Sequence, residues 1–183
     1  MEEHRSADEL TAALDDIRRS PVANGTVELI VRRPAENERE VLDEGVLDLE
    51  LGLVGDAWKA RGSSRTPDRS ANPDAQLTLM NARAAQAIAG TMERRPLAGD
   101  QLYVDLDLSI ENLPAGTRLA VGDAVIEVTL EPHTGCAKFS ARFGTEALKF
   151  VNKSPGRELR LRGVNTRVVT PGTVRAGDAI SKL

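Results

Sequence analysis

Two kinds of hydrophobic periodicity divide the chain near residue 25. Leu10, Leu14 and Ile17 recur at helical intervals behind Ser6-Ala7-Asp8-Glu9, which has the spacing of a capping box. This pattern predicts a helix from about residue 7 to 19, ended by Pro21. After residue 25 apolar and polar positions alternate over short runs, as in half-buried strands. We therefore expect an N-terminal helix and lead-in over residues 1–24 and a β domain over residues 25–183.

Short strand-like runs, separated by turn residues, occupy most of the second part. They lie at residues 26–31, 39–42, 45–51, 76–80, 102–108, 118–121, 124–130, 158–170 and 173–180. Gly-Asp pairs recur at 55–56, 99–100, 122–123 and 177–178 and indicate turns, because glycine accepts a positive φ and Asp bonds to nearby backbone. Further helices are expected only at 82–89 and within 136–152, and a long exposed loop at 61–73. Many short strands with frequent turns predict a mainly β fold, either a barrel or a sandwich.

Composition limits the classes of function. Aromatic residues make up 3% of the 183 residues, and the net charge of −4 comes from acids and bases mixed along the chain. Nucleic-acid binding requires clustered basic residues with stacking aromatics, so it is not expected. No apolar run is long enough to span a membrane, and the first residues lack the apolar core of a signal peptide. One cysteine cannot form an intrachain disulfide, which favours a cytoplasmic protein.

The residues able to carry chemistry gather at 131–144. Pro132 interrupts the chain after a predicted strand, and a helical turn is expected to begin near Cys136. Phe139 and Phe143 are four residues apart on that turn and should face the core.

Cys136 is the strongest candidate for a functional residue. A thiol at a helix N-terminus beside His133, Lys138 and Arg142 lies in a positive field that stabilises the thiolate, the form that attacks electrophiles and ligates metals. A buried cysteine that acts as a small apolar residue is the alternative. The flanking Gly135 and the basic neighbours favour a partly open pocket.

The two histidines carry less weight. His133 could orient or protonate a ligand, although a lone histidine is as often structural, and His4 lies in the predicted N-terminal helix. The chain has only one cysteine and two histidines, and His4 is far from Cys136 in sequence, so a closed zinc site of the Cys/His kind is excluded.

A second basic cluster surrounds residues 163–166. In the predicted strand, Arg160 and Arg162 point to one side, opposite Leu159 and Leu161. Two guanidinium groups on one face could bind a phosphate, and we predict that at least one of them lines the pocket of Cys136. A solvated outer strand face is the alternative.

At these residues the chain resembles the MOSC domain family, named for the C-terminal domain of molybdenum-cofactor sulfurase, and in particular its stand-alone bacterial YiiM-like members. The resemblance covers roughly residues 25 to 180. It rests on the order and spacing of Gly55-Asp56, residues 113–123, the run at 124–129, the cysteine segment 133–144 and residues 162–169 with Gly177-Asp178. YiiM-like members typically carry a His-rich, Gly-Gly loop after the first Gly-Asp pair, whereas this chain has the basic sequence of residues 58–68 there.

The resemblance implies a MOSC-type β-barrel with a few short helices that binds a molybdenum cofactor and reduces N-hydroxylated compounds. Cys136 would be a catalytic residue and the metal ligand, with His133 as a second catalytic residue. The residues implied in binding the cofactor, whose pterin ends in a phosphate, are Asp56 at the pocket rim, Arg61, Lys138, Arg142, Arg160, Arg162 and Asn165.

Two alternatives remain open. Cys136 could instead carry a persulfide for maturation of the molybdenum cofactor or of a metal–sulfur cluster, in which case pyridoxal phosphate would take part only through a cysteine desulfurase partner. The barrel could also be a non-catalytic module that binds a cofactor or a partner. An enzyme would further need a small-molecule substrate and an electron-transfer protein.

Overall fold

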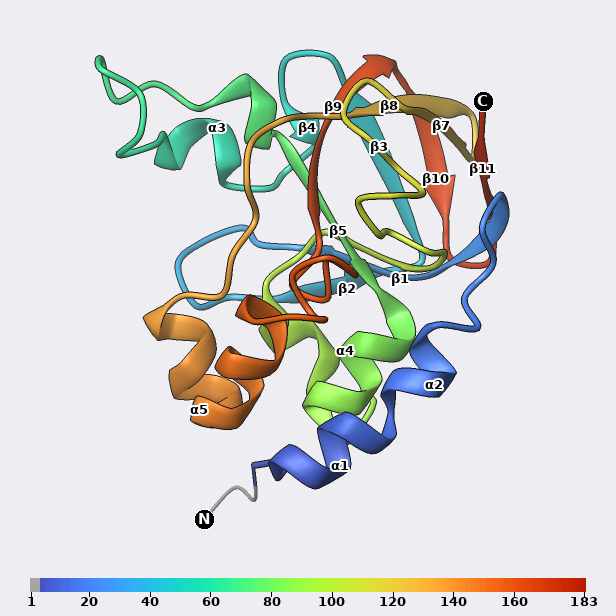
Figure 1. Ribbon diagram of the computed structural model, residues 1–183. Coiled ribbons are helices and arrows are strands. Elements are labelled where there is room, and N and C mark those ends of the chain that lie inside the picture. The colour runs from blue at the N-terminus through green and yellow to red at the C-terminus, as the bar shows by residue number, and fades with distance from the viewer. Residues whose placement is uncertain (1–3) are drawn as a thin grey trace.

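Seven strands form a closed barrel in the computed structural model, which describes residues 4–183 (Figure 1). The ring consists of β1 (Asn24–Arg32), β6 (Leu102–Asp105), β5 (Leu77–Asn81), β9 (Val164–Thr170), β8 (Ala124–Val128), β7 (Arg118–Val121) and β11 (Ala179–Lys182). Pairing of β11 with β1 closes the ring. Neighbouring strands are antiparallel except β5 and β6, which run parallel. This confirms the predicted mainly β barrel.

Four short strands lie outside the ring. The strand β2 (Glu40–Leu42) pairs with the C-terminal end of β1. A separate three-stranded sheet has the order β10 (Gly172–Arg175), β3 (Glu44–Asp48) and β4 (Gly52–Leu53). The predicted strand at 45–51 is thus β3 followed by a turn into β4, and the run at 173–180 is divided between β10 and β11.

Alternation along the strands sends apolar side chains into the barrel. In β8, for example, Ala124, Ile126 and Val128 are buried, whereas Val125 and Glu127 between them are partly exposed. Val27, Leu77 and Leu119 join them from other strands, and each is fully buried. Removing this apolar surface from water is the main stabilising contribution to the barrel.

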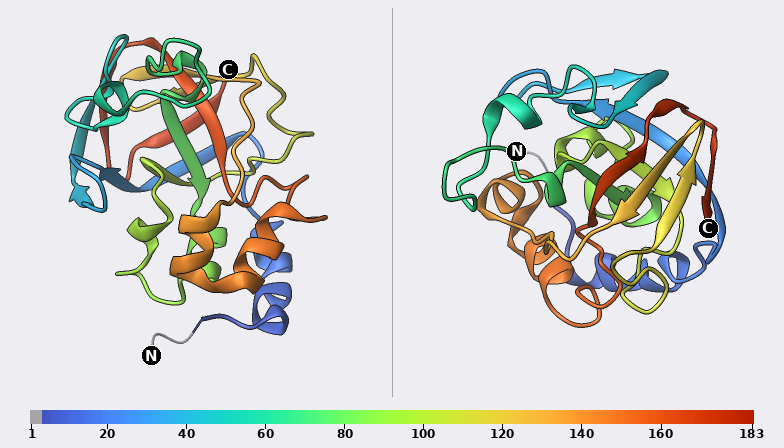
Figure 2. Two further views of the ribbon diagram at one scale, coloured as in Figure 1. Left: turned by 90° about the vertical axis from the view of Figure 1, so that its left-hand side faces the viewer. Right: turned by 90° about the horizontal axis from the view of Figure 1, so that it is seen from above.

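A second core lies between the barrel and four helices, which gather at one end of the molecule (Figures 1 and 2). The helices are α1 (Ala7–Ala12), α2 (Leu14–Ile17), α4 (Ala82–Ala89) and α5 (Ala137–Asn152). A short α3 (Trp58–Arg61) and two 3-10 helices, η1 (Pro73–Ala75) and η2 (Arg95–Ala98), complete the structure. Among residues 4–183 no helix combines the length and the apolar character that a membrane crossing requires.

Local signals placed most of the helices correctly. The capping box is present, with the Ser6 side chain accepting from the Glu9 N–H and Glu9 accepting from the Ser6 N–H, but the predicted helix at 7–19 is two helices that meet at Ala13. The helix α4 has the predicted bounds and ends at Gly90, whose φ is 79°. The helix α3 was not predicted.

One predicted strand is wrong in its first half. Residues 158–162 form turns, and β9 begins only at Val164. The Leu161 N–H donates to the Gly156 carbonyl and the Gly163 N–H to the Arg160 carbonyl, while Arg160 has a φ of 49°. A residue in the left-handed region cannot continue a strand, so the alternation of apolar and polar residues at 158–162 does not reflect strand geometry.

Candidate functional site

A cavity of about 590 Å³ lies beside the barrel, within the range of small-molecule sites. One wall is the segment 131–136, which runs from the end of β8 to the start of α5 and is drawn in orange in Figure 1. The facing wall is α3 and the loop after it, which project to one side of the barrel in Figure 1 and in the right-hand view of Figure 2. Thr78 of β5 and Asn165 of β9 also line the cavity.

Cys136 lies at the mouth of this cavity. It is the N-cap residue of α5, has an extended backbone and is exposed, which confirms the predicted open pocket. Phe139 and Phe143 on the same helix are buried, with ring centroids 5.0 Å apart, as their spacing predicted. Their burial anchors the helix that presents the thiol.

Four arginines, Arg33, Arg61, Arg65 and Arg69, line the cavity. Arg65 forms an ion pair with Glu131, which joins the loop to the opposite wall. Close contact inside the loop requires Gly62, which has a φ of 65°; a Cβ there would lie 2.2 Å from the Arg69 carbonyl oxygen. The cavity therefore has a strongly cationic wall, in a chain whose net charge is negative.

Asp56 holds Arg33 in place. Its carboxylate is fully buried and accepts two bonds of 2.8 Å from the Arg33 guanidinium and one of 3.0 Å from the Trp58 N–H. Burial would raise the pKa of Asp56, but the bonds and charge of Arg33 lower it below its ordinary value. The predicted cofactor-binding Asp56 thus has its oxygens occupied by Arg33, which is the residue that faces the cavity.

His133 lines the cavity and is bonded to a buried carboxylate. Its Nε2 lies 2.9 Å from Asp100 Oδ1, and Arg162 donates to Asp100 Oδ2 at 2.6 Å. Burial would raise the pKa of Asp100, but the charge of Arg162 and the contact with His133 lower it to about 2. Burial and then Arg162 lower the pKa of His133, while Asp100 opposes them, so the imidazole is neutral at neutral pH.

Arg162 and Arg160 do not occupy the predicted shared face. Arg162 is buried, donates to the Ala98 carbonyl as well as to Asp100, and has its guanidinium 5.1 Å from the Phe139 ring centroid. Arg160 donates at 2.6 Å to the Leu113 carbonyl. Neither lines the cavity of Cys136: both belong to turns, and their guanidinium groups bind Asp100 and backbone carbonyls instead.

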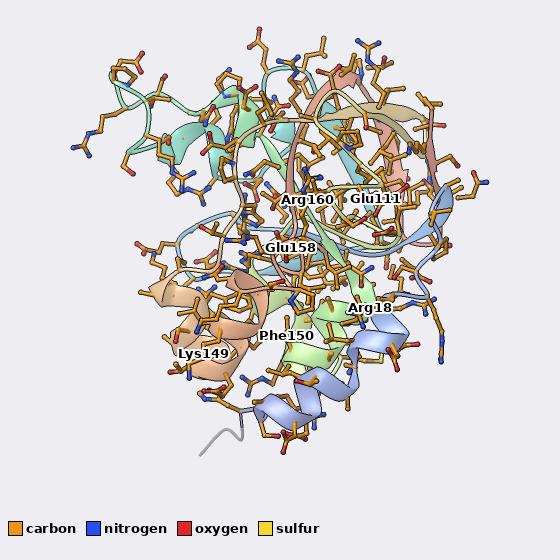
Figure 3. The ribbon with its side chains drawn as sticks, in the orientation of Figure 1. Arg18, Glu111, Lys149, Phe150, Glu158 and Arg160 are labelled. Carbon is orange, nitrogen blue, oxygen red and sulfur yellow. The ribbon has the colours of Figure 1, made fainter. Side chains whose placement is uncertain are left out.

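Figure 3 shows where Arg160 lies instead. It is in the same part of the molecule as Glu111 and Glu158, between the barrel and the helices. Its guanidinium is held by backbone carbonyls of the chain around residues 108–113.

The remaining predicted residues divide between the cavity and other surfaces. Lys138 pairs with Glu36 at 2.7 Å, and Arg142 donates to the Leu97 carbonyl at 2.8 Å; neither lines the cavity. Arg61 does line it. The buried Asn165 lines it too, and its Nδ2 donates to the carbonyls of Glu131 and Pro132 at 3.1 and 3.2 Å, which fixes the wall that carries His133 and Cys136.

Sequence reasoning missed Arg33 and Asp100. Asp100 belongs to one of the recurring Gly-Asp pairs, which predicted only a turn. Arg33 follows a strand with no motif around it. The position of Asp100 was the one signal in the sequence. An acidic residue just before an apolar strand needs a charged partner if it is buried, so Asp100 could have indicated a buried ion pair.

The fold and site together define a small β-barrel protein with a thiol at the mouth of a cationic pocket. A model of the MOSC domain matches residues 66–181, more than half of the chain. The chain therefore belongs to the MOSC domain family.

Solved structures share its fold. The YuaD protein from Bacillus subtilis has 17% identity and a TM-score of 0.63, covering 86% of this chain and 94% of that one. YiiM from Escherichia coli has 21% identity and a TM-score of 0.55, covering 86% of this chain and 69% of that one. A comparison with curated proteins gives no match.

Proposed function

We propose that this protein binds a molybdenum cofactor in the cavity through Cys136 and uses it to reduce N-hydroxylated small molecules. The observation that carries the proposal is that the one thiol of the chain shares a cavity with four arginines. A thiolate is a soft metal ligand, and arginine is suited to binding phosphate.

The donor set fits a cofactor that brings metal ligands of its own. Within residues 4–183 no three His, Cys, Asp or Glu side chains come together in a way that could hold a bare metal ion. One thiolate is enough when the cofactor supplies the other ligands. The terminal phosphate would be held chiefly by Arg61 and Arg69, which form no ion pair among the described residues. Arg33 would add positive charge beside them, although Asp56 holds its guanidinium, and Arg65 is paired with Glu131 across the cavity.

Each residue has a separate part. When bound, the cofactor would supply two-electron redox chemistry. Cys136 would hold the metal, the arginines would orient the anionic end, and His133 would contact the substrate. Asn165, through its bonds to the segment 131–136, would keep the thiol and the imidazole on the same wall.

Metal and pterin analysis tests the proposal. Protein purified from a molybdenum-replete host should contain both, and Cys136→Ser should lose the molybdenum. Arg69→Met should reduce pterin content, whereas Arg157→Met, an exposed arginine outside the cavity, should not. Wild-type protein without molybdenum and pterin would refute cofactor binding. Reduction of an N-hydroxylated compound with a supplied electron donor tests the activity separately.

The exposure of Cys136 also supports a second candidate function, transfer of sulfur as a persulfide. An exposed thiol can be reached by a cysteine desulfurase, which would itself carry the pyridoxal phosphate. Incubation with a desulfurase and cysteine should then add the mass of one sulfur atom at Cys136. Such an adduct on wild-type protein that contains no molybdenum would favour this candidate.

A further inference from the structure

A line of hydrogen bonds leads from the buried interior to the cavity. Arg162 donates to Asp100, and Asp100 contacts Nε2 of His133, the member of the line that reaches the cavity. Asp100 is fully buried and Arg162 is 7% exposed. Arginine can only donate and an ionised carboxylate can only accept, so Nε2 must carry the hydrogen in the bond to Asp100.

We propose that Asp100 and Arg162 are positioning residues that hold His133 as the neutral Nε2–H tautomer and leave Nδ1 as a hydrogen-bond acceptor for the bound substrate. No hydrogen bond from the described residues reaches Nδ1. The site then prefers a substrate that presents a donor, such as an N–OH group, to His133. The tautomer does not depend on the proposed cofactor, whereas the identity of the donor rests on the proposed function.

Gly163 lies beside both His133 and Asp100. At Gly163, where φ is 108°, a Cβ would lie 2.3 Å from the Leu79 carbonyl oxygen, 3.1 Å from His133 Cδ2 and 3.3 Å from Asp100 Oδ1. The backbone at Gly163 therefore packs directly against the edge of the imidazole and against its carboxylate partner.

The charges that act on His133 are those of Asp100, Arg162 and Arg33. Arg162 serves two purposes: it balances the charge of Asp100, and it disfavours a second proton on the imidazole. A carboxylate and a histidine without the arginine would tend toward a charged pair, in which Nδ1 would be a donor. With Arg162 present, Nδ1 keeps its lone pair.

The tautomer can be observed directly, because the chain has only two histidines. Long-range proton–nitrogen correlation spectra of histidine-labelled protein at pH 7.5 should show His133 with Nε2 protonated and Nδ1 unprotonated. His4→Gln identifies the other set of signals. A wild-type His133 that carries its hydrogen on Nδ1, or on both nitrogens, would overturn the proposal.

Asp100→Asn provides a sharper test. Because Arg162 must still donate, the new amide should turn its oxygen toward Arg162 and its NH₂ toward His133. Nε2 would then have to accept, and the hydrogen should move to Nδ1. The matched control is Asp105→Asn. Asp105 is another carboxylate paired with an arginine, Arg83, and the loss of its charge should leave the His133 tautomer unchanged. A folded Asp100→Asn protein with the wild-type pattern would refute the positioning role; if this variant does not fold, the wild-type spectrum decides.

Ligand binding tests the consequence for the substrate. An N-hydroxyamidine should bind wild-type protein about 3- to 10-fold more tightly than its O-methyl ether, which lacks the hydroxyl donor; this range corresponds to one neutral hydrogen bond. In Asp100→Asn the preference should disappear or reverse. Equal affinities in the wild type, together with the predicted tautomer, would contradict the proposed substrate class and leave the positioning role standing.

Discussion

Replacing Arg162 by methionine tests whether the buried ion pair is needed for folding. Methionine keeps a long, unbranched side chain but removes the guanidinium that lies over the Phe139 ring, together with its 2.6 Å charged bond to Asp100 and its 3.0 Å bond to the Ala98 carbonyl. Asp100 is fully buried, so its charge would lose its strongest partner and could not reach water. Removing one member of a buried pair costs about 3–5 kcal/mol for this reason.

The cost of Arg162→Met should depend on pH. Without the arginine, His133 can take up a proton and pair with Asp100, because the charge that helped to lower the pKa of His133 is gone. We therefore expect a loss of about 4 kcal/mol at pH 8 and a smaller loss at pH 5.5. For a chain of this size, 4 kcal/mol corresponds to a fall in Tm of about 8–16 °C.

Urea unfolding at the two pH values provides the measurement. The exposed Arg157→Met serves as control and should change the free energy of unfolding by less than about 0.5 kcal/mol. The double variant Arg162→Met with Asp100→Asn should recover about 1–3 kcal/mol, because no unpaired charge remains buried. A single-variant cost below about 1 kcal/mol at pH 8, or a double variant no more stable than the single one, would refute this account.

Four further predictions concern other parts of the molecule. Gly163→Ala should lose about 1–3 kcal/mol from backbone strain alone, with more from the clash at the Leu79 carbonyl; a loss below about 0.5 kcal/mol in denaturant titrations would be inconsistent with the packing. Ser6→Ala should lower the unfolding free energy by about 1 kcal/mol through the broken capping box, and an unchanged Tm would show that the cap contributes nothing. Native Cys136 should react with iodoacetamide about as fast as in denaturant, whereas modification only after unfolding would contradict its exposure. The free energy of unfolding of the wild type should fall as pH drops below about 6.5, because the unfolded chain binds a proton at His133 more readily than the folded protein does. It should fall again between about pH 4 and 2, where Asp100 takes up a proton. A free energy that does not change with pH would exclude both effects.

The sequence by itself determined the local elements and the segment that carries the thiol. Alternation located most of the barrel strands, an alanine-rich run that ends at Gly90 placed α4, and phenylalanine spacing predicted the buried face at the start of α5. These features depend on a few neighbouring residues, so their physical causes can be read along the chain. Of the residues that the sequence assigned to the site, Arg61, His133, Cys136 and Asn165 lie on the cavity. The basic neighbours of Cys136, Lys138 and Arg142, do not, and the cavity takes its positive charge from other arginines.

Only the tertiary structure decided which charges meet. Arg162 and Asp100 are 62 positions apart, and His133 is 33 from Asp100, so nothing in the local pattern links them. Residues 160–162, Arg-Leu-Arg, alternate as a strand would, but they form a turn in which Arg162 reaches the buried carboxylate of Asp100. The stability of a buried charge depends on the partner that the fold brings to it. Arg162 and Asp56 therefore do not line the cavity: Arg162 binds Asp100, the partner of His133, and Asp56 binds Arg33.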